Sequence, residues 1–222
     1  MAEKIVKSIS WIVTLVLIGT LVVTMISFFP ESTRGFDDSV SAWASVGTSI
    51  SCNVIPDALA FGTLTTGLVS EATDTATTTL TSNTTAFIKI YDWGDSPNAT
   101  SGLYAATSTP SYNIQSAGNG RATSTLVAST GEGYGLRAAT TTAGSGAEME
   151  LGERYKTWYL DQFSSDAVGG LVYGTSSAIV IASSSATVTG REVVVSHKAA
   201  ISASASAGDY KDTILYICST SL

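Results

Sequence analysis

The sequence has little of the chemistry that most enzymes use. Its 222 residues include one histidine, two cysteines and four prolines, and only 13% of them are charged. Acid–base catalysis and metal binding depend mostly on His, Cys, Asp and Glu side chains, so few combinations of such groups are available. The sequence therefore favours a structural or binding protein over an enzyme and predicts neither a cofactor nor a metal site.

Positive charge is also scarce. Eleven Lys and Arg residues stand against eighteen Asp and Glu residues, which gives a formal net charge of −7. Binding to nucleic acid is driven by clustered Lys and Arg side chains that neutralise phosphates. We therefore expect no nucleic-acid partner.

Small hydroxyl side chains take the place of the missing charge. The chain has 31 Thr and 32 Ser residues, and 44% of its residues are hydrophobic. That hydrophobic fraction is too high for disorder driven by net charge. Straight-chain helix formers are few, whereas Thr, Val and Ile favour strands, so the composition indicates a mainly β protein.

The first thirty residues differ from the rest. Residues 11–29 contain no charged side chain, and as a helix they would reach about 28 Å, close to the hydrocarbon thickness of a bilayer. We predict that residues 1–30 form a signal-anchor helix or the core helix of a filament. The residues that we expect to contact lipid or neighbouring copies are Trp11, Val13, Leu15, Leu17, Leu21, Met25, Phe28 and Phe29.

Two fates are open for this segment. Its apolar run is longer than that of a cleaved signal peptide, and the nearest small-x-small sequence, at residues 42–44, lies well beyond it, which favours retention over removal. Lys4 and Lys7 are expected to stay cytoplasmic before assembly, so that the rest of the chain is exported to the cell surface. Type IV pilins carry Glu at the fifth position, where this chain has Ile5, so helix-core assembly is an analogy only.

The remainder divides into a linker, residues 31–48, and an exported domain, residues 49–222. Short β-branched and aromatic runs alternate with turn signals through the domain, which predicts an antiparallel immunoglobulin-like β-sandwich. The expected strands are Ile50–Ile55, Ala58–Leu64, Ala76–Thr81, Ala86–Tyr91, Thr123–Ala128, Gly133–Ala138, Ala147–Leu151, Lys156–Leu160, Ala178–Ala182, Glu192–Ser204 and Lys211–Cys218. Residues 92–120 and 139–146 are expected to be surface excursions.

Cys52 and Cys218 lie in the first and last expected strands. Outside the cytoplasm an even pair of cysteines is normally oxidised, and neighbouring terminal strands would bring the two together. We predict a Cys52–Cys218 disulfide, with two free buried thiols as the alternative.

Several polar residues were weighed for chemistry. His197 lies in an expected strand without the nucleophile motif of a hydrolase, so a strand-face histidine is favoured over a catalytic base. Asp92 and Asp95, with Trp93, form a candidate ligand loop for Ca²⁺ or another ligand, or else a turn with capping carboxylates. Glu148, Glu150 and Glu153 alternate with apolar residues and are expected on the wet face of a strand.

Surface modification and sugar binding are further hypotheses. Asn83 and Asn98 match the short N-glycosylation pattern, although unmodified Ser and Thr-rich loops are the ordinary alternative. Several aromatic residues are expected either to form a platform on which a carbohydrate stacks or to pack in the core. They are Trp43, Tyr91, Trp93, Tyr155, Trp158 and Tyr159.

Two segments carry a family resemblance. The first is Cys52-Asn-Val-Ile-Pro-Asp-Ala-Leu-Ala-Phe-Gly-Thr-Leu64, and the second is Ala207-Gly-Asp-Tyr-Lys-Asp-Thr-Ile-Leu-Tyr-Ile-Cys218. Both resemble the ends of spore-coat-protein-U-like and archaic chaperone–usher pilin domains. The exported part, with Glu132-Gly-Tyr-Gly135 and His197-Lys-Ala-Ala200, also resembles Ser/Thr-rich membrane-anchored surface proteins of candidate-phylum bacteria. The resemblance implies an immunoglobulin-like sandwich in a surface filament or coat.

The leading hypothesis is therefore a structural subunit that assembles with copies of itself into a filament, pilus-like fibre or coat through the N-terminal helix and the spacer. A spacer segment such as Val40–Val46 could add to the open sheet edge of a neighbour. The alternative is a membrane-anchored adhesin or carbohydrate-binding module whose loop around Trp93 binds surface glycans.

Overall fold

The computed structural model describes residues 44–94, 96–97, 100–108, 110–117, 123–125, 131–174 and 178–221. A boundary between Ser45 and Val46 divides the chain into two units, and the second, Val46–Leu222, contains every strand given below. The predicted helix over residues 11–29, including Trp11, Val13, Leu15, Leu17, Leu21, Met25, Phe28 and Phe29, lies outside the described residues. Within the described residues, no helix is long and apolar enough to span a membrane.

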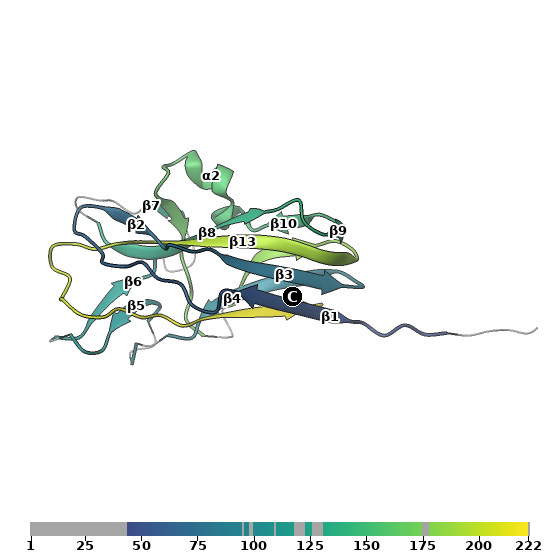
Figure 1. The fold of residues 1–222 in the computed structure, drawn as a ribbon, viewed down its shortest axis with the longest axis horizontal. Coiled ribbons are helices and arrows are strands. Elements are labelled where there is room, and N and C mark those ends of the chain that lie inside the picture. The colour runs from purple at the N-terminus through teal and green to yellow at the C-terminus, as the bar shows by residue number, and fades with distance from the viewer. Residues whose placement is uncertain are drawn as a thin grey trace, which may run out of the picture. The chain divides into compact units, whose positions relative to one another are not determined.

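Antiparallel sheets dominate the described part of the chain, which confirms the predicted mainly β class (Figure 1). The larger sheet has the order β1-β3-β13-β8-β11-β7, with β2 and β9 also paired to β13; the smaller has the order β10-β12-β4-β14, and β5 pairs with β6. The strands are β1 (Ile50–Ile55), β2 (Val69–Glu71), β3 (Ala76–Ser82), β4 (Ala86–Asp92), β5 (Gly102–Ala105), β6 (Tyr112–Gln115), β7 (Thr123–Thr125), β8 (Gly133–Thr140), β9 (Ser145–Gly146), β10 (Met149–Leu151), β11 (Ala167–Gly169), β12 (Ile179–Ser184), β13 (Val188–Ala200) and β14 (Ile214–Ser219).

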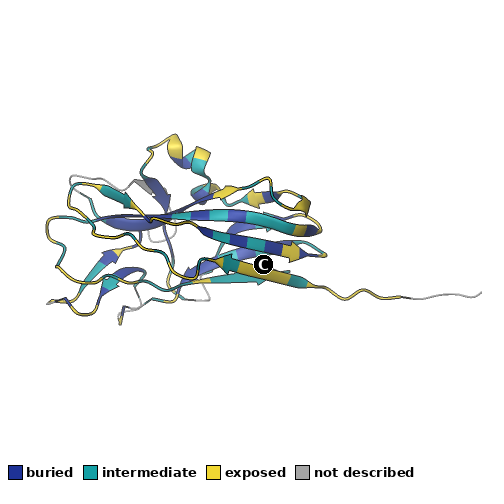
Figure 2. Ribbon diagram, in the orientation of Figure 1, coloured by how far each residue is buried: buried dark blue, intermediate teal, exposed yellow. Residues whose placement is uncertain are grey.

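One hydrophobic core joins the two main sheets, as expected of a sandwich. The long strand β13 pairs with both β3 and β8, and every second side chain from Val193 to Ala199 faces inward. In the smaller sheet, Ile88 and Ile90 lie two residues apart in β4, on one face of the strand, and are fully buried. Figure 2 shows the buried residues concentrated along these central strands, so β13 and β4 form the centre of the fold.

The disulfide between Cys52 and Cys218 closes one side of the sandwich and confirms that prediction. Cys52 pairs with the buried Leu80 across β1 and β3, and Cys218 pairs with the buried Ile88 across β14 and β4. Both cysteines therefore project from the inner faces of their sheets. Their Cα atoms are 6.3 Å apart, so the bond ties the first strand of one sheet to the last strand of the other.

Two expected strands were wrong. Residues 58–64 contain no strand. The run follows Pro56, and Thr73 holds it in place, because the backbone N–H and the hydroxyl of Thr73 both donate to the carbonyl of Ala60. Residues 156–160 include the start of a short helix, α2 (Thr157–Asp161), after a 3₁₀ turn, η2 (Glu153–Tyr155). Within the described part of the chain, residues 58–64 alternate like a strand but pair with none, and residues 156–160 form only a single bridge, between Lys156 and Ala138.

The expected surface excursion over residues 92–120 was also wrong in part. It contains the β5–β6 hairpin, in which Leu103 and Ile114 pair and are buried in the core. Gly102 permits this close pairing, since its φ of +135° places it where a side chain would be strained and would meet the β6 backbone. Ser, Pro and Gly-rich sequence flanks the hairpin and conceals its two short strands.

Basic side chains on the outer face of the larger sheet hold the segment of α2. Arg137 of β8 donates to the carbonyls of Thr157 and Ser165 and forms an ion pair with Asp161. Lys198 of β13 donates to the same Ser165 carbonyl at 2.6 Å. These bonds fix α2 against the sheet and leave the inner face of β8 to the core.

We predict that removing the disulfide lowers the free energy of unfolding by about 5 kcal/mol, because the cross-link spans 166 residues and restricts the unfolded chain. Denaturant unfolding of a Cys52→Ser/Cys218→Ser variant measures this change. A reductant should shift the unmodified protein to the midpoint of the variant and leave the variant unchanged. Equal midpoints for the oxidised protein and the variant would contradict the prediction.

Candidate functional site

The first candidate site is the open edge of the larger sheet. Among the strands that the structure describes, β1 pairs with β3 alone. The backbone N–H of Asn83 donates to the carbonyl of Ser49 at 3.2 Å, which begins the alternation of hydrogen-bonded and non-hydrogen-bonded pairs. That alternation turns the backbone groups of Ile50, Cys52 and Val54 away from β3. The exposure of Cys52 shows that solvent reaches this edge.

The chain that leads into this edge is extended and exposed. Residues 44–49 have no regular secondary structure, and Val46 is 88% exposed (Figure 1). The side chain of Asn83 holds the end of the segment, since it donates to the carbonyl of Gly47 and accepts from the N–H of Ser49, both at 2.8 Å. Part of the predicted linker therefore runs directly into an edge strand. The predicted glycosylation acceptor Asn83 is exposed, but its amide already serves these bonds.

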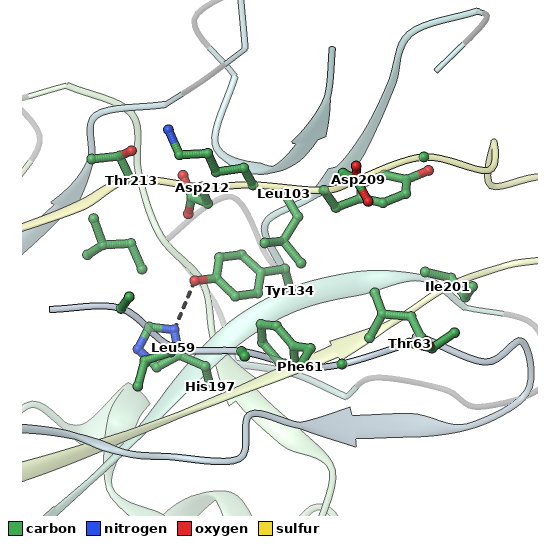
Figure 3. Close-up of a pocket in the computed structure, with 18 of the residues that line it drawn as sticks. Leu59, Phe61, Thr63, Leu103, Tyr134, His197, Ile201, Asp209, Asp212 and Thr213 are labelled. Atoms are coloured by element: carbon green, nitrogen blue, oxygen red, sulfur yellow. Dashed lines mark hydrogen bonds between the residues drawn. The ribbon is translucent and has the colours of Figure 1, made fainter. Parts of the chain in front are cut away.

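A cavity of about 1200 Å³ is the second candidate site. One wall is the segment that follows β1, with Leu59 and Phe61, and the facing wall is the segment before β14, with Asp209 and Asp212 (Figure 3). Tyr134 lies between the walls and meets Phe61 edge-on, with ring centroids 6.1 Å apart. The expected strand over residues 58–64 is therefore a cavity wall.

The cavity contains a buried polar pair. Tyr134 of β8 and Nδ1 of His197 of β13 are 2.9 Å apart and hydrogen-bonded. Burial lowers the pKa of His197 from its ordinary 6.5 to about 4, so the imidazole is neutral at pH 7. Burial, with a smaller contribution from Asp212, raises the pKa of Tyr134, so its hydroxyl stays protonated. The pair is therefore uncharged.

The predicted ligand loop is divided by the structure. Asp92 ends β4 inside the molecule, where its carboxylate accepts from the N–H of Gly102 at 2.7 Å. Trp93 is 55% exposed and packs edge-on against Tyr91. Asp92 thus supports the β5 hairpin and does not share an exposed surface with Trp93. Asp95 and the predicted acceptor Asn98 lie outside the described residues.

The remaining candidates fall into two groups. Glu148 and Glu150 flank the buried Met149 and are exposed, as predicted, but Glu153 lies in η2 and not on the face of a strand. In the described part of the chain no three His, Cys, Asp or Glu side chains gather as a metal site would require. Of the aromatic residues, Tyr155 is fully buried, whereas Trp158 is 63% exposed on α2.

Searches of known family descriptions, curated proteins and solved structures found no match to this chain. Sequence reasoning placed His197 on a strand but missed the cavity. A signal was present, because His197 continues the inward series of Val193 and Val195 and is therefore directed at the core. The wall over residues 58–64 alternates like a strand, so its sequence indicates a strand and not a cavity wall.

We predict that His197 makes the fold acid-sensitive. The unfolded chain binds a proton at this side chain as the pH falls through about 6.5, whereas the folded chain does so only near pH 4. Stability should therefore fall between pH 6.5 and 4, by up to roughly 3 kcal/mol, and be unaffected by this group above that window.

Denaturant unfolding at pH 7 and pH 4.5 measures this effect. The loss on acidification should be smaller in a His197→Phe variant, because carboxylate contributions are common to both proteins and cancel in the difference. The same loss in both proteins would show that His197 is not buried as a neutral group.

Proposed function

We propose that the protein is a structural subunit of a cell-surface filament, pilus-like fibre or coat, which assembles with copies of itself. The observation that carries the proposal is the open edge of β1, continuous with the exposed segment over residues 44–49. An extended peptide binds such an edge through backbone hydrogen bonds.

The sequence of this edge supports the proposal. Soluble proteins usually protect edge strands with charges, proline or a covering element. Strand β1 contains neither a charged residue nor proline, and its end exposes 61% of Ile55. The other strand of the disulfide-linked side, β14, is also uncharged. Edges of this kind favour association with a further strand.

The apolar residues 11–29 complete the proposal. In it, they form a helix that holds the subunit in the membrane before assembly, with the N-terminus cytoplasmic, and that lies in the membrane or the filament core afterwards. The exported part, residues 31–222, carries nine Lys and Arg against seventeen Asp and Glu. An acidic surface rich in Ser and Thr keeps the exported part hydrated and soluble outside the cell. The resemblance of the two end segments to pilin-type domains agrees with this role.

A membrane-anchored adhesin is the second candidate function. The favouring observation is the exposed ring of Trp93. The next residue, Gly94, lies close against the ring of Tyr173, since a Cβ at Gly94 would be only 2.7 Å from that ring. Aromatic rings displayed at a turn can stack on sugars. In this case the protein would bind surface glycans as single copies.

We predict that Val46→Lys reduces filament formation roughly tenfold. When the segment over residues 44–49 adds as a strand to the uncharged β1 edge of another copy, the Lys side chain would lose hydration without gaining a partner of opposite charge. Electron microscopy and sedimentation of the purified full chain measure the yield of filaments. Removal of residues 1–45 should abolish them.

Leu68→Lys is the matched control, since Leu68 is also an exposed aliphatic residue, at 59%, but lies before β2 and away from the β1 edge. It should leave the yield unchanged. Equal losses in the two variants would contradict a role for the segment over residues 44–49. Single particles in every condition, with glycan binding lost in Trp93→Ala, would favour the adhesin.

A further inference from the structure

The cavity between the two loops has the size and lining of a small-molecule site. Ligand pockets in proteins commonly enclose about 300–1,000 Å³ and are mostly apolar, with a few polar groups that orient the ligand. This cavity, of about 1200 Å³, is comparable, and its apolar lining includes Leu59, Phe61, Leu64, Leu103 and Ile201.

Hydrogen bonds hold both loops in place. Ala60 in the first loop accepts from the N–H and the hydroxyl of Thr73, at 2.8 and 3.1 Å. Lys211 in the second loop exchanges two backbone hydrogen bonds with Tyr104 of β5, at 2.8 and 3.0 Å. The cavity is therefore formed by the fold itself and needs no loop movement to exist.

Two buried polar atoms in the lining lack partners. His197 is only 5% exposed, and its Nδ1 is engaged by Tyr134, but its Nε2 has no hydrogen-bond partner among the described residues. The hydroxyl of Tyr216 is likewise buried and unpartnered within that part of the chain. A buried polar group without a partner is costly, so each such atom marks a place where a ligand could supply a hydrogen bond.

Charge restricts the ligand further. Asp57, Asp209 and Asp212 line the cavity with one cation, Lys211, for a net charge of −2, which disfavours anions. Both unpartnered groups, on His197 and Tyr216, are neutral at pH 7, since burial keeps the imidazole unprotonated and the phenol protonated. An anionic head group placed against them would be buried without a counter-charge.

We propose that this cavity binds a small uncharged alcohol, with its apolar body against Leu59, Phe61 and Leu103 and its hydroxyl hydrogen-bonded to Nε2 of His197. A hydroxyl both donates and accepts, so it satisfies either neutral tautomer of the imidazole. The site is distinct from the open backbone edge of β1, although the side chain of Val54 at the end of that strand contributes to the lining.

The chain has one histidine, so an imidazole signal reports on this cavity alone. We would label the full chain with ¹⁵N-histidine and record the Nε2 resonance at pH 7 while adding 1-decanol or, separately, decanoate. Decanol should move the Nε2 resonance in a saturable way, whereas decanoate, of the same chain length, should not move it at the same concentration. No saturable change with decanol, or equal changes with both, would overturn the proposal.

Two variants locate the binding. Ala76 is 3% exposed and lines the cavity, so Ala76→Leu should fill part of it and raise the decanol concentration at half-saturation roughly tenfold. Phe163→Ala, which removes an exposed ring from the segment after α2, should leave that concentration unchanged. The reverse result would place the alcohol on the outer surface and overturn the proposal. The comparison of decanol with decanoate uses the unaltered chain and so does not depend on how either variant folds.

Discussion

The packing of β13 against the smaller sheet is the interaction on which the rest of the structure depends. This strand pairs with β2, β3, β8 and β9, and its inward side chains meet the buried residues of β4 and β12 in one core. At an order of magnitude, each fully buried aliphatic side chain contributes about 1.5–3 kcal/mol. The disulfide joins β1 to β14 at one side of the sandwich. It therefore holds β1 in position although the outer edge of this strand has no partner among the described strands.

The same strand couples the core to the cavity. Val193 and Val195 fill the space between the sheets, whereas the next inward residue, His197, meets a region where the loops replace the second sheet. A valine at this position would extend the apolar core, but the imidazole brings a polar atom into it and requires Tyr134 as a partner. The cost of that burial appears as the lowered pKa of His197.

Much of the fold could be predicted from the sequence, for reasons that particular residues show. The β-branched and aromatic run over residues 86–91 identified β4, and the position of the two cysteines in terminal strands identified the disulfide. The short strand Val69–Glu71 escaped because its partner, β13, is distant in sequence. Gly102–Ala105 escaped because Ser, Pro and Gly-rich sequence flanks its hairpin. The residues 58–64 alternate like a strand but become a cavity wall, and only tertiary structure decides between the two. Among the candidate site residues, Asp92 looked like part of an exposed turn because its burial depends on the β5 hairpin.

In the proposed assembly, copies of the protein associate through the open edge of β1. Hydrogen–deuterium exchange of single backbone amides tests it most directly, in assembled and in dispersed protein. We expect the amides of Ile50, Cys52 and Val54, which point away from β3, to exchange fast in dispersed protein and to become protected on assembly. Those of Ser51 and Asn53, which point toward β3, should be protected in both states. Fast exchange of the three outward amides in the assembled protein would contradict the account.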